Sequence, residues 1–120
     1  MKTQGELESE VSQAVNRFKR EYLGRGPQSV RSYLFDDLLV VRLKSVLTPA
    51  EKRLAQLADA QRGRELIKQL RMELIEHGRE LLETALREIL GVGIVSLHTD
   101  ISTRTGESVI VFTLEKNPFD

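Results

Sequence analysis

HTDISTRTGESVIVF, residues 98–112, contains the turn that decides how this chain folds. Apolar and polar residues alternate on both sides of TRTGE, in VGIVSLHTDIS before it and in SVIVFTLEK after it. This alternation is typical of β-strands, whose successive side chains point to opposite faces, and Gly106 can supply the positive φ that a short loop needs. The stretch therefore predicts a hairpin made of the last two strands of a sheet.

A second hairpin is expected earlier in the chain, in SVRSYLFDDLLVVRLKSV, with strands at residues 29–35 and 38–46. The stretch is rich in β-branched and aromatic residues, and it is interrupted by Asp36 and Asp37. These adjacent carboxylates have the pattern of a solvated turn, and binding of a divalent cation is the alternative. One face of the second strand is apolar and consists of Leu39, Val41 and Leu43.

The first helix is expected over residues 5–23, where apolar residues recur at three- and four-residue steps. GRGP, residues 24–27, then ends it, because a glycine can adopt the left-handed capping conformation and Pro27 cannot continue a helix. The same turn offers Arg25 as an exposed anion contact. It follows a helix rather than preceding one, and it lacks the lysine and hydroxyl residue of a P-loop, so a helix stop is the first interpretation.

Two further helices follow the first hairpin. Thr48, Pro49 and Glu51 form a capping box with proline at the favoured position, which predicts a helix from there to about Ala60. A break near Gly63 is expected to separate it from the next helix.

The last helix is predicted over residues 64–90 and ends at Gly91. At 1.5 Å per residue it is about 40 Å long, which exceeds the width of a small sheet, so we expect part of it to project and pair with a second copy of the chain. Gly78 lies inside it and indicates either close packing or a bend.

The order α-β-β-α-α-β-β over residues 1–120 predicts a single α+β domain. We expect a two-layer sandwich, in which helices cover one face of a mostly antiparallel four-stranded sheet.

Composition excludes several classes of function. Eighteen basic residues balance 18 acidic ones, and aromatic residues make up only 5%, which argues against a nucleic-acid partner. The absence of cysteine excludes disulfides and thiolate chemistry and fits a cytoplasmic protein. The acidic N-terminus has no signal-peptide pattern, and no apolar run is long enough for direct membrane insertion.

The C-terminal hairpin, around residues 98–112, offers one cluster of chemically useful side chains. His98 and Asp100 share a strand face, and Arg42 and Lys44 would approach them if the two hairpins lie side by side. Such a cluster suits anion binding or acid–base chemistry, whereas the alternative is a cross-strand ion pair on a solvated or dimer-facing surface. We expect no metal site, because a third ligand with a defined spacing is missing, and we name no catalytic residue.

Three motifs resemble the bacterial MpsC-like family, which is labelled as part of a Na+-translocating membrane-potential-generating system. They are YLGRGP at residues 22–27, VLTPAEKRLA at 46–55 and VSLHTDISTRTGESVIVFTLEKN at 95–117, and the resemblance covers essentially the whole chain. It implies a cytoplasmic accessory or regulatory component, and it carries over no catalytic residue.

Three functional hypotheses follow. The first is a non-enzymatic homodimer without a cofactor that binds a membrane-associated partner of a membrane-potential or ion-transport system. The second is a sensor that holds a small anion or a nucleotide near Arg25, Arg31, Arg42 and His98. The third is a hydrolase that uses His98 and Asp100, which would require a pocket around the histidine.

Overall fold

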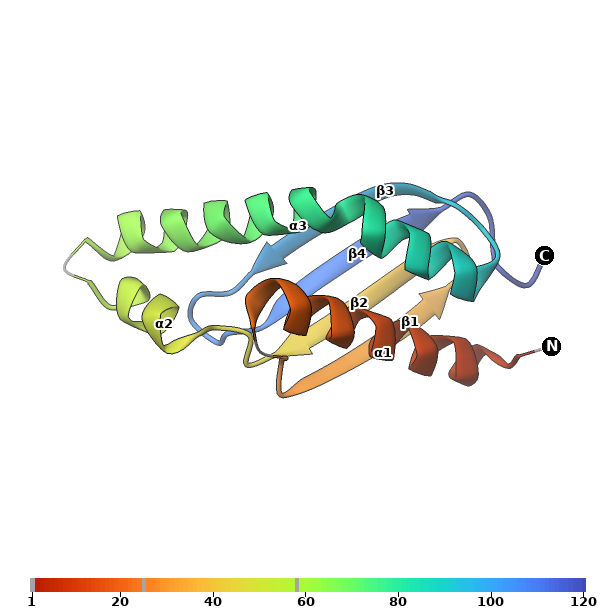
Figure 1. Cartoon of the computed structure of the whole chain (residues 1–120), viewed down its shortest axis with the longest axis horizontal. Coiled ribbons are helices and arrows are strands. Elements are labelled where there is room, and N and C mark those ends of the chain that lie inside the picture. The colour runs from red at the N-terminus through yellow and green to blue at the C-terminus, as the bar shows by residue number, and fades with distance from the viewer. Residues whose placement is uncertain (1, 25, 58) are drawn as a thin grey trace.

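Four antiparallel strands form one open sheet, and the helices lie on one of its faces (Figure 1). The computed structural model describes residues 2–24, 26–57 and 59–120. The α+β class and the order α-β-β-α-α-β-β are as predicted. The elements are α1 (Gln4–Leu23), β1 (Ser29–Phe35), β2 (Leu38–Lys44), α2 (Pro49–Ala55), α3 (Ala60–Leu90), β3 (Ile94–Ile101) and β4 (Ser108–Leu114).

The sheet has the order β1-β2-β4-β3, so the two hairpins are joined through β2 and β4. In this central pairing Leu39 lies opposite Phe112, and Phe112 in turn lies opposite Leu97 of β3. Residues directly opposite each other share a face, so this register places one apolar side chain from each of three neighbouring strands on the same side. An irregularity between Ile94 and Ser96 shifts the register at the start of β3.

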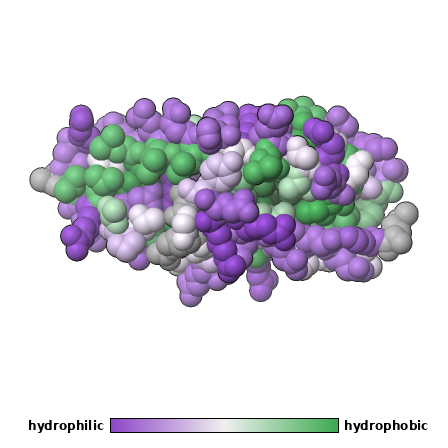
Figure 2. All heavy atoms as spheres, viewed as in Figure 1, coloured by the Kyte–Doolittle hydropathy of each residue, from purple (hydrophilic) through white to green (hydrophobic). Residues whose placement is uncertain are grey.

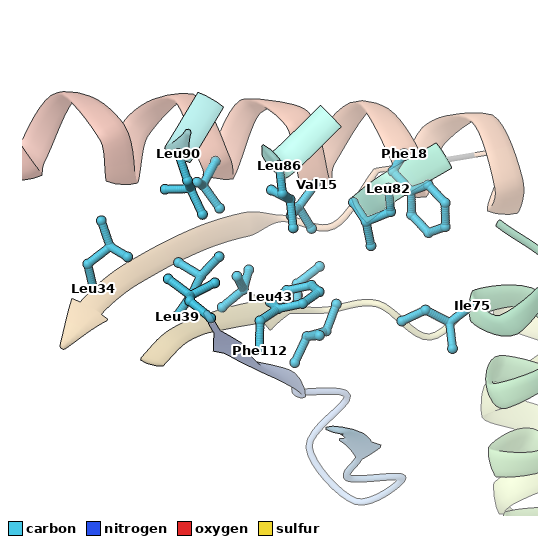
Figure 3. Packing of buried hydrophobic residues seen from close by; sticks show 14 of the residues in the cluster. Val15, Phe18, Leu34, Leu39, Leu43, Ile75, Leu82, Leu86, Leu90 and Phe112 are labelled. Carbon is cyan, nitrogen blue, oxygen red and sulfur yellow. The ribbon is translucent and has the colours of Figure 1, made fainter. Parts of the chain in front are cut away.

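The hydrophobic core fills the space between this face and the helices (Figure 3). Val15 and Phe18 of α1 and Leu82 of α3 point toward Leu39 and Phe112 of the sheet. These side chains are almost completely removed from water. Because burial of apolar area is the main favourable term in folding, this layer holds the helices on the sheet.

At both ends of β2 the chain turns without glycine. Asp36 has a φ of 57°, a left-handed conformation that aspartate tolerates better than most residues. Ser45 also has a φ of 57°, and β2 ends just before it at Lys44 rather than at residue 46 as expected. A backbone turned into this conformation cannot continue the extended strand.

The expected break near Gly63 was wrong. The helix that Thr48 caps ends at Ala55 rather than near Ala60, and Asp59 caps α3 by accepting a hydrogen bond from the Arg62 backbone N–H. Residue 58, in this connection, lies outside the described residues.

Gly63 itself is buried inside α3, where an added Cβ would overlap the backbone carbonyl of Leu54. The glycine therefore allows α2 and α3 to approach closely. A glycine in a helix interior costs roughly 1 kcal/mol relative to alanine, and this packing contact offsets that cost.

Gly78 confirms the close-packing interpretation. A Cβ at this position would lie 2.5 Å from a ring carbon of Phe18 and 2.8 Å from one of Tyr22, both on α1. The predicted stops at Gly91 and at the GRGP turn are also confirmed, because Gly91 and Gly24 adopt φ values of 73° and 76°.

α2 and the N-terminal half of α3 extend beyond the end of the sheet and give the molecule dimensions of 52 × 24 × 22 Å (Figure 1). Leu66 and Leu70 of this half of α3 are exposed, and Figure 2 shows hydrophobic side chains gathered over it. Among the described helices, none has an apolar stretch long enough to cross a bilayer.

Candidate functional site

The sheet face that points away from the helices carries the candidate site. Side chains alternate along β1, so Leu34 is buried against the helices while Arg31, Tyr33 and Phe35 point outward. The neighbouring strand β2 extends this surface, because Arg42 lies directly opposite Arg31. We call this surface the outer sheet face.

One half of the outer sheet face is basic. Ser29, Arg31, Tyr33, Arg42 and Lys44 line a depression of about 190 Å³. The Arg31–Arg42 pair places two like charges directly opposite each other, an arrangement that destabilises a sheet unless something balances it.

Only part of this positive charge is balanced. Arg42 Nη2 lies 2.7 Å from a carboxylate oxygen of Glu107, and this hydrogen bond raises the pKa of Arg42 above its usual value. Within the described residues, neither Arg31 nor Lys44 takes part in an ion pair. The depression therefore presents a net positive surface that an anionic group can complement.

The other half of the outer sheet face is apolar. Phe35 is 76% exposed and Tyr33 is 41% exposed, which is unusual for large aromatic residues. Leu38 and Val40 lie opposite them on β2 and are half-buried. Aromatic residues beside arginines have the composition of protein–protein interfaces.

The structure brings two of the five predicted site residues together, Arg31 and Arg42, and it separates His98 and Asp100 from them. His98 and Asp100 lie on the edge strand β3, and Val109 of β4 stands between Asp100 and Arg42. Since neighbouring strands are about 4.8 Å apart, this places the two backbones roughly 10 Å from each other. Arg25 lies outside the described residues.

His98 and Asp100 are also not joined by a hydrogen bond or an ion pair. Asp100 accepts a hydrogen bond from the Ile101 N–H at 2.8 Å and pairs with Lys68 Nζ at 3.1 Å, and these two interactions lower the pKa of its carboxyl. His98 is exposed opposite Val111. In a His–Asp catalytic pair the carboxylate orients the imidazole through a hydrogen bond, and the hydrogen bonds of Asp100 go to Ile101 and Lys68 instead.

Metal binding finds no support in the part of the chain that the structure describes. Within residues 2–24, 26–57 and 59–120, no three His, Cys, Asp or Glu side chains come close enough to hold an ion.

A second group of charged residues, which the sequence interpretation missed, lies beneath the helices. Lys19 of α1, Glu51 of α2 and Arg71 of α3 are all largely buried. The sequence positions of two of them could have indicated burial. Lys19 follows Val15 by four residues and Arg71 follows Ile67 by four, so each lies on the apolar stripe of its helix. A charged residue on the apolar stripe of an amphipathic helix indicates a buried charge.

Arg71 joins three parts of the chain. Its Nε donates to Glu51 Oε2 at 2.8 Å, and its Nη2 donates both to Glu51 Oε1 and to the backbone carbonyl of Val46. Glu51 also completes the capping box of α2, since it accepts a hydrogen bond from the Thr48 N–H. Burial alone would raise the pKa of Glu51, but the bonds from Arg71 and Thr48 outweigh it and lower that pKa.

Lys19 adds a second cation to this group. Burial, and to a smaller extent the charge of Arg71, lowers its pKa from 10.5 to about 8. Two buried cations thus lie near one buried carboxylate, and that carboxylate is paired with Arg71.

Comparison with known proteins places the chain in a family. A family model described as "Na+-translocating membrane potential-generating system (MpsC)" matches residues 3–116. This chain belongs to the MpsC family. The chain is similar to the uncharacterized protein YbcI of Bacillus subtilis (strain 168), with 42% identity over 97% of this chain and 94% of that protein.

A more distant relative is the uncharacterized protein YrhF of the same organism. It is 24% identical over 89% of this chain and 86% of its own length. No solved structure matches the chain significantly.

Proposed function

We propose that this MpsC-family protein is a cytoplasmic, non-enzymatic accessory protein that binds a membrane protein of an ion-transport or membrane-potential-generating system. The family description, which names a Na+-translocating membrane potential-generating system, supports the choice of this kind of partner. The observation that carries the proposal is the outer sheet face, where exposed Tyr33 and Phe35 adjoin Arg31 and Arg42.

The partner that fits this face is a protein segment with an apolar anchor and a nearby carboxylate. Large aromatic residues supply contact area with little loss of conformational entropy, and arginine pairs with carboxylates through two parallel hydrogen bonds. Arg31 has no counter-ion among the described residues, so an acidic partner gains an ion pair without breaking the one between Arg42 and Glu107.

Two other occupants fit less well. The basic depression has a volume of about 190 Å³, below the roughly 300–1,000 Å³ of typical small-molecule pockets, which disfavours a nucleotide. An anionic lipid surface would meet Asp36 and Asp37, which form the turn directly after Phe35, and these carboxylates would be repelled by it.

Site-specific photocrosslinking tests the proposal in the cells of origin. With p-benzoylphenylalanine in place of Phe35, we expect a crosslink to an integral membrane protein of an ion-translocating system, identified by mass spectrometry. The same probe at Thr84, which is exposed on the helix layer, serves as the control and should not capture that protein.

Charge reversal measures the electrostatic part of this interaction. Arg31→Glu should weaken binding of the captured protein by about tenfold or more, because it places like charges at the contact. Arg53→Glu makes the same change at an exposed position of α2 and should leave the affinity nearly unchanged.

Three results would contradict the proposal. These are a crosslinked protein that is unrelated to ion transport, binding to protein-free anionic vesicles that depends on Arg31, and a nucleotide that raises the melting temperature of the wild type but not of Arg42→Ala.

We further propose that the protein is a homodimer in which the α3 helices of two copies pack antiparallel. Leu66, Leu70 and Leu81 are exposed along one stripe of this helix. Exposed charges are on balance basic at the start of α3, with Arg62, Arg64 and Lys68 against Glu65, and on balance acidic from Glu73 onward, with Glu73, Glu76, Glu80 and Glu88 against Arg87. Antiparallel packing would place the basic half of each copy beside the acidic half of the other.

Light scattering checks the oligomeric state. We expect a mass twice the 13.6 kDa of the chain, and we expect Leu66→Glu combined with Leu70→Glu to give the monomer. Phe35→Ser lies on the outer sheet face and should leave the dimer intact. A wild-type protein that remains a monomer at high concentration would remove this proposal.

A further inference from the structure

A small cavity lies between the helices and the edge of the sheet, away from the outer sheet face. Its volume is about 160 Å³. Lys19 of α1, Arg71 of α3 and Thr99 of β3 are among the residues that line it. The ion pair between Lys68 and Asp100 stands at its exposed edge, since both side chains are largely accessible to water.

The wall of this cavity carries an unbalanced charge. Lys19 is only 7% exposed, and it makes neither a hydrogen bond nor an ion pair with the residues described around it. Glu51 is the nearby buried carboxylate, and both of its oxygens already accept hydrogen bonds from Arg71. Burial of an unpaired ammonium is costly, and a counter-ion offsets that cost.

We propose that this cavity binds a small monovalent anion, whose charge Lys19 and Arg71 neutralise and to which the hydroxyl of Thr99 donates a hydrogen bond. The charges determine the valence, because Lys19, Arg71 and Glu51 together leave one positive charge, while Lys68 and Asp100 cancel each other.

The volume determines the size of the anion. A water molecule occupies about 30 Å³, so 160 Å³ admits an anion of a few heavy atoms and excludes a nucleotide. Ile75 and Met72 form an apolar part of the wall, which suits an anion with a methyl group, such as acetate, as well as chloride or nitrate.

Binding of the anion is coupled to protonation of Lys19. Burial and Arg71 lower the pKa of Lys19 to about 8, while Glu51 acts in the opposite direction. An anion beside the ammonium stabilises its charged form and raises that pKa. Calorimetry at pH 8 to 9 in buffers with different ionisation enthalpies should therefore show proton uptake on binding.

Nuclear magnetic resonance titration with sodium chloride, sodium nitrate and sodium acetate tests the site directly. Ionic strength is held constant with sodium gluconate, whose anion is too large for the cavity. We expect at least one of the three salts to give saturable shifts of the Thr99 and Ile101 amides, in the strand that borders the cavity.

Two variants assign the effect to the cavity. Lys19→Met should weaken binding by about tenfold or more, because it removes the charged donor. Thr99→Val keeps the charges and should weaken it by roughly threefold or more. Lys52→Met, at an exposed position of α2, removes the same charge elsewhere and should change nothing. No saturation with any salt, or equal affinity in both cavity variants and the wild type, would overturn the proposal.

Discussion

Glu51→Gln is expected to lower the free energy of unfolding by about 3–5 kcal/mol, because it leaves the buried guanidinium of Arg71 without its carboxylate partner. Urea unfolding at pH 7 followed by circular dichroism measures the change. The effect should be the largest of any single substitution discussed here, since a buried charge without a partner is the most costly polar defect.

Thr48 provides the matched control for this prediction. Glutamine can replace glutamate in a capping box, so Glu51→Gln keeps the helix cap and removes only the charge. Thr48→Ala does the opposite and should cost about 1 kcal/mol. A loss for Glu51→Gln no greater than that of Thr48→Ala would show that the ion pair contributes little.

The dependence of the free energy of unfolding on pH, in the acid range, gives a second test of the contribution of Glu51. Its pKa is lowered in the folded protein, so its contribution is fully present above the pKa of the unfolded chain and is lost as the pH falls through the folded value. Glu51→Gln should therefore flatten the decline in stability below about pH 4.

Lys19→Met is expected to have the opposite effect and to stabilise the protein at pH 7 by about 3 kcal/mol, provided that the buffer contains no small anions. The pKa of Lys19 falls from 10.5 in the unfolded chain to about 8 in the folded protein, so the folded state disfavours the charged form. Methionine has a similar volume and no charge to bury.

The sign of the pH dependence follows from the same shift. Between pH 8 and pH 10.5 the unfolded chain holds more protons on Lys19 than the folded protein does, so the stability of the wild type rises with pH. The advantage of Lys19→Met should thus be greatest below pH 8 and disappear above pH 10.5.

Urea unfolding at three pH values across this range, in gluconate buffer, measures the difference, and Lys52→Met controls for general charge effects. A variant that is less stable than the wild type at pH 7 would mean that Lys19 is favourably paired.

Most of the fold could be predicted because its signals are local. The capping box at Thr48, the left-handed glycine at Gly91 and the period-two alternation around Gly106 each depend on neighbours in the sequence. The boundary between α2 and α3 could not be predicted in this way. Gly63 has the local preference of a helix breaker, whereas the carbonyl of Leu54 makes it a packing position.

The candidate site was harder to predict, because alternation determines which face a side chain occupies but not which strands are neighbours. The order β1-β2-β4-β3 places β4 beside β2, so Arg42 meets Glu107 and not Asp100. The partner of Asp100 is Lys68, which comes from a helix that passes the edge of the sheet. Both outcomes depend on contacts between residues far apart in the sequence.

The pairing of β2 with β4 has a consequence for synthesis of the chain. Residues 38–43 of β2 cannot pair with residues 108–113 of β4 until the ribosome has made β4. At a synthesis rate of about 5–20 residues per second, the interval between the two strands lasts several seconds. During that time the edge of β2 is free, and its sequence LLVV is the kind that pairs with other chains. The growing chain is therefore most prone to aggregate after β2 has been made and before the last hairpin is complete.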